Sequence, residues 1–245
     1  MRERLTPKQV ARAIGVSESS LKRWCDRGLI PFERTAGGHR RMVMSDVVSF
    51  LRNGGYKVVR PDILGLPATS GRTGWTLDQA RERFLSALVI GNDDACRRIL
   101  IDLYLSGHGL AAIGDRILAE SFRQVGHLWE CGDLEVYEER RGCEICVRLV
   151  HELRALQEQP PTTAPVALGA TLDGDPYTLA VAMAEVVLRE AGYRATSLGH
   201  MLPFNTLHAA LEQQRPRLMW LSVSSIRDLD RFAEEVNRLH EACVA

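Results

Sequence analysis

The apolar residues change their spacing along the chain, and this change limits the fold more than any other feature. Residues 76–158 carry apolar side chains at helical spacing nearly throughout, with breaks at glycine-containing turns. From residue 166 onward, short apolar runs alternate with helical segments in the order strand, helix, strand, helix, strand, helix. We therefore expect a multidomain α and α/β protein, in which a four-helix bundle precedes a Rossmann-like unit with a parallel sheet.

Two segments with little periodicity divide the chain into three domains. Residues 1–60 form the first domain, and the glycine- and proline-containing residues 61–75 are predicted to be a linker. The bundle covers residues 76–158, residues 159–165 form a second, proline-rich linker, and the α/β unit covers residues 166–245. Because a doubly wound sheet usually has more than three strands, we expect this α/β unit to be truncated at its C-terminal end.

The charged residues are unevenly distributed, although the formal net charge is zero. Residues 1–60 hold 13 Lys and Arg against 5 Asp and Glu, whereas residues 61–245 hold 18 against 26. A basic N-terminal domain suits contact with a polyanion such as nucleic acid. No apolar run approaches the roughly 20 residues that span a bilayer, and the N-terminus does not resemble a signal segment. We expect a cytoplasmic protein without a membrane partner.

Residues 6–24 have the pattern of a helix-turn-helix. Thr6 and Pro7 form a good helix start, a turn follows at Gly15, and Ser17 caps a second helix. Such a second helix enters the major groove of DNA by its N-terminal half, where hydroxyls and long cations reach base edges and phosphates. The residues that we expect to make these contacts are Ser19, Ser20, Lys22 and Arg23.

An arginine-rich turn follows this second helix. Its centre, Gly37-Gly38, lets the backbone approach a phosphate closely, and cationic side chains flank it on both sides. Contacts to phosphates supply affinity and register without reading the base sequence. The predicted phosphate contacts are Arg34, His39, Arg40 and Arg41.

The segments 28–31 and 34–41, with the sequences Gly-Leu-Ile-Pro and Arg-Thr-Ala-Gly-Gly-His-Arg-Arg, resemble the recognition helix and wing of the MerR family. The resemblance is close over about residues 5–52. It implies a winged helix-turn-helix whose wing grips phosphates. It also implies a transcriptional regulator that binds operator double-stranded DNA as a homodimer or homotetramer.

Residues 76–245 resemble, more weakly, the cobalamin-dependent photoreceptor repressors of the CarH/LitR group. The resemblance implies a repressor and names adenosylcobalamin as the candidate cofactor. Trp129 stands where that family packs a tryptophan on the cofactor, and Glu139-Arg140 stands where it has Glu-His. The run Leu-Ser-Val-Ser-Ser is similar to the family's serine loop beside the cofactor tail, with the candidate residues Ser222 and Ser224.

The chain departs from this family in the loop after the first strand of the α/β unit. The family's histidine, which ligates cobalt from below, is replaced by Tyr177, and its glycine by Ala180. A phenol with a pKa of about 10 is largely protonated at neutral pH and is a poor cobalt ligand. The alternatives are cobalamin held without a lower histidine, another ligand, or no ligand. We expect His200 to be an ordinary loop histidine rather than a substitute ligand.

Two functions from other classes are also considered. A corrinoid methyl-carrier-like protein fused to a DNA-binding head would need the intact ligand loop that Tyr177 interrupts. A cysteine-based metal or redox sensor is suggested by the spacing of Cys143 and Cys146, but these residues fall in a helical segment without a second ligand pair. No nucleophile elbow, phosphate-binding glycine loop or zinc-protease motif is present, so we expect no catalytic residues, no metal site and no enzyme.

Overall fold

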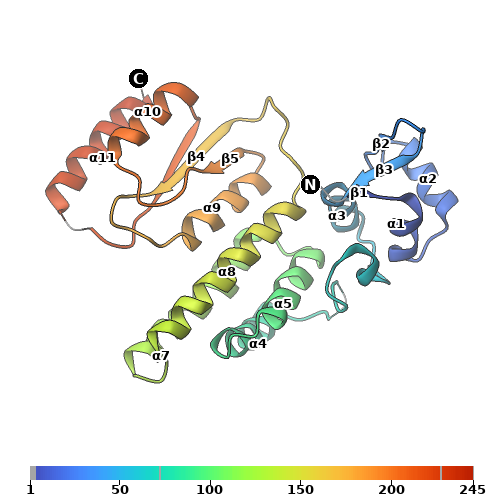
Figure 1. The fold of residues 1–245 in the computed structure, drawn as a ribbon, viewed down its shortest axis with the longest axis horizontal. Coiled ribbons are helices and arrows are strands. Elements are labelled where there is room, and N and C mark those ends of the chain that lie inside the picture. The colour runs from blue at the N-terminus through green and yellow to red at the C-terminus, as the bar shows by residue number, and fades with distance from the viewer. Residues whose placement is uncertain (1–3, 72, 227, 245) are drawn as a thin grey trace. The chain divides into compact units, whose positions relative to one another are not determined.

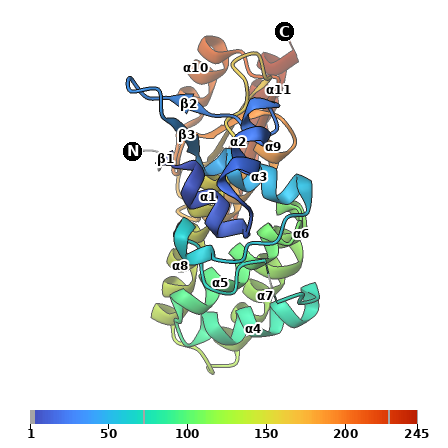
Figure 2. The ribbon, with the colours of Figure 1, turned by 90° about the vertical axis from the view of Figure 1, so that its right-hand side faces the viewer.

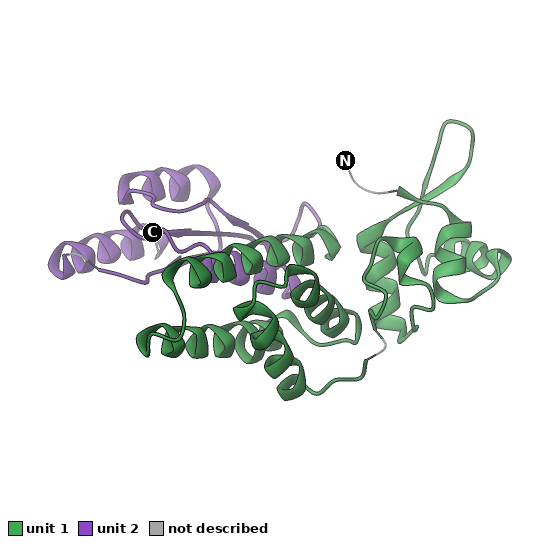
Figure 3. Cartoon of the chain, turned by 60° about the horizontal axis from the view of Figure 1, so that its bottom comes forward, with its two compact units in different colours: residues 1–159 green, residues 160–245 purple. Residues whose placement is uncertain are grey.

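The computed structural model describes residues 4–71, 73–226 and 228–244. They form two compact units, residues 1–159 and residues 160–245 (Figure 3), which are considered separately below. The first unit contains the N-terminal head and the helical bundle, and the second is the α/β unit. In the described part of the chain, no helix is both long and apolar enough to cross a membrane.

The head is a small helical domain with a three-stranded antiparallel sheet in the order β1-β3-β2. Thr6 starts the first helix with a reciprocal capping box to Gln9, and Gly15 ends it in the left-handed conformation. Ser17 caps the second helix by accepting a hydrogen bond from the Ser20 amide. The elements are β1 (Arg4–Leu5), α1 (Pro7–Ile14), α2 (Glu18–Asp26), β2 (Glu33–Arg34), β3 (Arg40–Val43) and α3 (Met44–Gly54).

The segment after the head is packed, although its composition predicts a linker. It contains a 3-10 helix, η1 (Pro61–Leu64), and the side chains of Val58, Leu64 and Leu66 are buried. The amides of Val59 and Arg60 both donate to the carbonyl oxygen of Ala13 in α1. The glycines and prolines of this segment are typical of a linker, but the apolar residues between them bury enough surface to hold it against the head.

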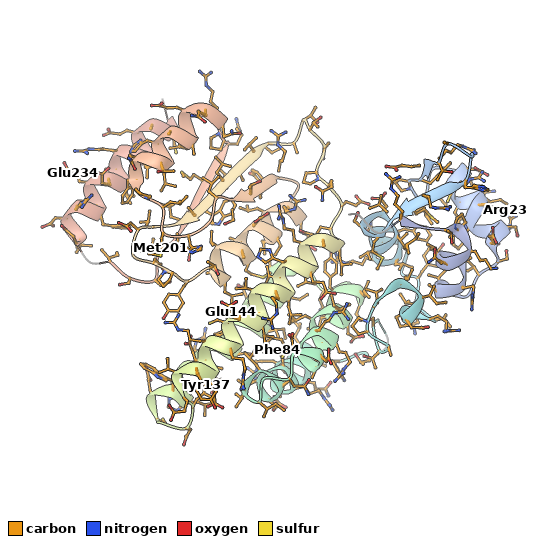
Figure 4. The ribbon with its side chains drawn as sticks, in the orientation of Figure 1. Arg23, Phe84, Tyr137, Glu144, Met201 and Glu234 are labelled. Carbon is orange, nitrogen blue, oxygen red and sulfur yellow. The ribbon has the colours of Figure 1, made fainter. Side chains whose placement is uncertain are left out.

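The bundle consists of four helical rods (Figure 2), as the three glycine-containing breaks predict. The third of these helices is continuous and consists of three consecutive segments: α6, the π-helical stretch η2, and α7. Phe84 is fully buried and lies in the centre of the bundle (Figure 4). The elements are α4 (Leu77–Val89), α5 (Asp93–Leu105), α6 (Leu110–Ile113), η2 (Gly114–Ala119), α7 (Glu120–Glu130) and α8 (Val136–Leu156).

The second unit is a three-stranded parallel sheet in the order β5-β4-β6 with flanking helices (Figure 1). This confirms the predicted alternation of strands and helices. Gly169 in the central strand is required, because a Cβ atom there would lie 1.9 Å from the indole of Trp220 in the neighbouring strand. The elements are β4 (Val166–Thr171), α9 (Leu179–Glu190), β5 (Arg194–Ser197), α10 (Phe204–Gln214), β6 (Leu218–Ser222) and α11 (Leu229–Val244).

Candidate nucleic-acid interface and ligand edge

The N-terminal half of α2 carries a cluster of hydroxyl groups. The Oγ atom of Ser17 lies 2.9 Å from the Oγ atoms of both Ser19 and Ser20. The guanidinium of Arg23 donates to the Ser20 hydroxyl at 3.2 Å, and Figure 4 shows Arg23 at the outer margin of the head. Hydroxyls and a guanidinium on the exposed side of one helix can donate to base edges or phosphates.

Lys22 is held one turn away from the start of this helix. Its ammonium group forms an ion pair of 2.7 Å with Glu18, and the hydrogen bond from Lys22 lowers the pKa of the Glu18 carboxyl. Because both side chains are well exposed, this pair is weak and can exchange its partners when a phosphate approaches.

Strands β2 and β3 form the wing hairpin, with Arg34 paired to Arg40. In its turn, the Thr35 amide donates to the His39 carbonyl at 2.9 Å, and Gly38 has a φ of 77°. The Arg34 guanidinium donates to the Gly38 carbonyl, so Arg34, Gly38 and His39 gather at the exposed end of the hairpin. Arg41 is half-buried and donates to the Arg40 carbonyl.

Arg40 has different surroundings from the other predicted wing cations. Its guanidinium forms a 2.6 Å ion pair with Asp26, the last residue of α2. Its Cζ atom lies 5.3 Å from the centroid of the Phe32 ring, and its side chain is 20% exposed. Arg40 therefore connects the wing to the end of the recognition helix.

The candidate cofactor residues of the bundle come from two helices that pack against each other, α7 and α8. Trp129, near the end of α7, is 50% exposed, so part of its side chain is available to a ligand. Glu139 in α8 is half-buried, accepts a hydrogen bond from the Cys143 thiol and forms a 3.4 Å ion pair with Arg140. The arginine that replaces the family's histidine thus holds the neighbouring glutamate.

The paired cysteines of α8 lie in surroundings that disfavour the thiolate. Burial, and next to it the charge of Glu139, raises the pKa of Cys143 to about 12. Burial also raises the pKa of Cys146 well above its ordinary value. Because metal binding and thiol exchange use the thiolate, these raised pKa values disfavour both. Among the residues that the structure describes, no three His, Cys, Asp or Glu side chains form a group that could hold a metal ion.

Hydrogen bonds connect the three loops at the carboxyl edge of the parallel sheet. The Asp175 carboxylate, in the loop after β4, accepts from the amide of Ser224 at 2.5 Å and from that of Tyr177 at 3.1 Å. The Thr171 hydroxyl donates to the Asp175 carbonyl and accepts from the Met201 amide, which belongs to the loop after β5. Asp175 is 1% exposed, so this buried carboxylate fixes the edge where such sheets bind their ligands.

The predicted cofactor residues of this unit lie at that edge. Tyr177 is 39% exposed, Ser222 ends β6 and is half-buried, and Ser224 contributes its amide to Asp175. His200 is exposed in the loop between β5 and α10. A cobalamin held by a protein imidazole does not fit these residues. A phenol, that of Tyr177, stands where the resemblance places the histidine, and backbone amides already donate to both oxygens of the Asp175 carboxylate.

Asp175 is not among the site residues that the sequence pattern predicts. An acidic residue directly before Pro176, in a loop that follows an apolar strand, is a signal for a side chain that bonds to nearby amides. The role of Thr171 could not be read in this way, because it lies at the end of a strand that is otherwise apolar.

Two family models match the chain. The model described as a helix-turn-helix domain covers residues 4–55, and the one described as a B12 binding domain covers residues 80–154. The HTH-type transcriptional repressor CarH of Myxococcus xanthus is 26% identical over 95% of this chain and 83% of its own length. CarA, a second HTH-type transcriptional repressor of that organism, is 25% identical over 96% of this chain and 82% of its own length.

The chain is a helix-turn-helix transcriptional regulator of the CarH type. The match of residues 80–154 assigns the helical bundle of this regulator, rather than its parallel sheet, to the B12 binding domain. The monomethylamine corrinoid protein of Methanosarcina barkeri shares the fold, with a TM-score of 0.54 and 14% identity over 68% of this chain and 79% of that one. The regulator thus joins a DNA-binding head to a body whose bundle and parallel sheet have the architecture of a corrinoid protein.

Proposed function

We propose that the regulator represses transcription by binding an operator in double-stranded DNA through α2 and the wing. The observation that carries this proposal is the exposed hydroxyl and guanidinium cluster on α2, held beside a hairpin with exposed cationic side chains. The recognition helix then reads the bases through Ser19, Ser20, Lys22 and Arg23, and the wing contacts phosphates.

Selection from fragmented genomic DNA, followed by titration of the selected duplex and a scrambled one, tests this function. We expect specific binding at least about a thousandfold tighter than binding to the scrambled duplex at moderate salt. Equal affinity for both duplexes would show that the head binds DNA without reading an operator. No binding to either would contradict DNA recognition altogether.

We propose that the regulator binds this operator as a homodimer or homotetramer. One recognition helix covers only a few base pairs, and paired half-sites one helical turn apart supply the remaining specificity. Two-fold symmetry predicts an operator with inverted repeats. Analytical ultracentrifugation with and without the selected duplex measures the number of chains, and a single chain bound to an operator without symmetry would contradict this proposal.

We propose that the body acts by binding and assembly rather than by catalysis, and that it does not ligate cobalt through histidine. A corrinoid methyl carrier would need the imidazole that Tyr177 replaces. We also propose that the protein is located in the cytoplasm, where it would meet its operator DNA. The bundle and the sheet then form an effector module of cobalamin-binding type, in which the affinity for cobalamin has been weakened or lost.

Incubation with adenosylcobalamin in the dark, followed by gel filtration, tests this part of the proposal. We expect the protein peak to be colourless and the operator to be held equally in light and dark. The matched variant Tyr177→His with Ala180→Gly restores the imidazole and the glycine, and we expect it to retain more cofactor than the unmodified chain. Co-elution of cofactor and unmodified chain near one per chain would show that the body binds it without the histidine.

A further inference from the structure

Arg40 lies between two groups of the head that are not part of its own strand. One edge of the guanidinium faces the Asp26 carboxylate at 2.6 Å, at the end of α2. Its Cζ atom lies 5.3 Å from the centroid of the Phe32 ring, which precedes β2. The Cζ atom of Arg34 lies 5.6 Å from the same centroid, so two guanidinium groups pack on one ring.

The surroundings of Arg40 leave it little surface for a phosphate. Its side chain is 20% exposed, and its Nε atom is buried without a hydrogen-bond partner among the described residues. Arg34, in contrast, is exposed, and among the residues that the structure describes its guanidinium donates to the Gly38 carbonyl of its own turn. A guanidinium that is already paired with a carboxylate must give up that partner before it can neutralise a phosphate.

The pair formed by Arg40 and Asp26 also has a mechanical consequence. Asp26 is the last residue of the recognition helix, and Arg40 is the first residue of β3. On its other side the hairpin is held by the ion pair of Arg4 and Glu33, which joins β1 to β2. The hairpin is therefore held by two ion pairs, one to the end of α2 and one to β1.

We propose that Arg40 is a positioning residue, which sets the wing against the recognition helix through Asp26 and Phe32. The phosphate contacts of the wing then belong to Arg34, His39 and Arg41. This differs from the role that the arginine-rich pattern alone assigns to Arg40. It rests on the proposed binding of operator DNA, because a wing needs a fixed position only if it reaches the duplex together with α2.

The two roles predict opposite effects of Asp26→Asn. If Arg40 positions the wing, loss of its partner weakens operator binding by about two- to fivefold, the effect of one partly exposed ion pair. If Arg40 contacts a phosphate, the same change removes a competing anion near the DNA and tightens binding. Fluorescence anisotropy with the selected operator distinguishes the two signs, and tighter binding by Asp26→Asn would overturn the proposal.

The salt dependence of binding gives a second readout. We expect Asp26→Asn, which keeps every cation of the wing, to lower the slope of log K against log salt, because a displaced wing loses phosphate contacts. Arg41→Ala should lower that slope by about 0.9, as one lost phosphate contact does. The double variant Asp26→Asn, Arg40→Ala should bind no more weakly than Arg40→Ala alone, because both changes break one interaction. An unchanged slope for Asp26→Asn would overturn the proposal.

Hydroxyl-radical footprinting separates positioning from a general loss of stability. We expect Arg40→Ala and Asp26→Asn to lose the backbone protection given by the wing. Methylation by dimethyl sulfate should show that α2 still protects guanine N7 in the major groove. Arg40→Lys keeps the ion pair and should retain most of the wing protection. If Arg40→Ala fails to fold, Asp26→Asn and Arg40→Lys carry the test. Failure of the unmodified chain to bind any duplex would contradict operator binding itself and is distinguishable from these outcomes.

Discussion

The guanidinium of Arg52, near the end of α3, lies 3.8 Å from the centroid of the Tyr104 ring in α5. It also donates to the carbonyl oxygen of His108, which follows α5, at 3.1 Å. A second cation, Arg97 of α5, binds Glu152 of α8 and donates to the Gly65 carbonyl at 3.2 Å. The head and the segment after it are thus attached to the bundle by two arginines, so a change in the bundle can reach the DNA-binding helices.

Arg52→Ala should loosen the attachment of head to bundle. It removes a cation–π contact worth about 0.5–2 kcal/mol, together with the hydrogen bond to His108. We expect faster amide hydrogen exchange in residues 56–71 and in the last turn of α3, measured by mass spectrometry. Arg60→Ala is the matched control, because Arg60 lies in the same segment but pairs only with its exposed neighbour Asp62. Equal exchange in Arg52→Ala and the unmodified chain would contradict this attachment.

Arg34→Ala should weaken binding to all duplexes alike. Because Arg34 is exposed at the turn of the wing, its loss removes one phosphate contact and lowers the salt slope by about 0.9. Arg23→Ala should instead change the preference among operator variants, since Arg23 lies on the recognition helix. Titrations at several salt concentrations, on operator and scrambled duplexes, measure both effects. Arg238→Ala, on α11 of the other unit, is the control, and it should change neither.

The buried thiols should react slowly and weaken the fold at high pH. Burial raises the pKa of Cys96 and Cys143 to about 12, and it raises that of Cys146 well above its usual value. A raised pKa in the folded state stabilises the protein fully below the unfolded value of about 9. The stabilisation is lost as the pH rises from about 9 toward 12. At pH 8, alkylation followed by mass spectrometry should therefore modify the exposed Cys131 and Cys243 first.

The outcome that would contradict this prediction is alkylation of Cys143 at the rate of Cys131 in the folded protein. Unfolding in urea supplies the control, because all six thiols of the chain then have ordinary pKa values and comparable rates. A cysteine-based sensor would need a reactive pair in α8, so slow labelling of Cys143 and Cys146 also argues against that function.

The sequence predicted features that depend on local pattern, and it missed contacts between distant segments. The breaks at Gly91 and Gly132 follow from the need for a left-handed residue at a helix end, which can be read from spacing alone. The packing of Leu64 could not be read in that way, because the glycines and prolines around it are typical of a linker. The ion pair of Arg40 and Asp26 joins residues that are 14 positions apart in the sequence. No local pattern indicates which of the several arginines of the head pairs with the Asp26 carboxylate.

Asp175→Asn should destabilise the α/β unit. The buried carboxylate accepts hydrogen bonds from the backbone amides of Tyr177 and Ser224. The Nδ2 group of asparagine can only donate, so one of these two amides would lose its hydrogen-bond acceptor. A buried polar group left without a hydrogen bond costs about 1–3 kcal/mol. Urea unfolding followed by circular dichroism measures this loss. The matched control is Asp173→Asn, two residues earlier, whose side chain is exposed. Equal stability of the two variants would show that the loop after β6 is held without Asp175. A larger loss for Asp175→Asn would show that this carboxylate maintains the edge of the sheet, where a ligand of the body would bind.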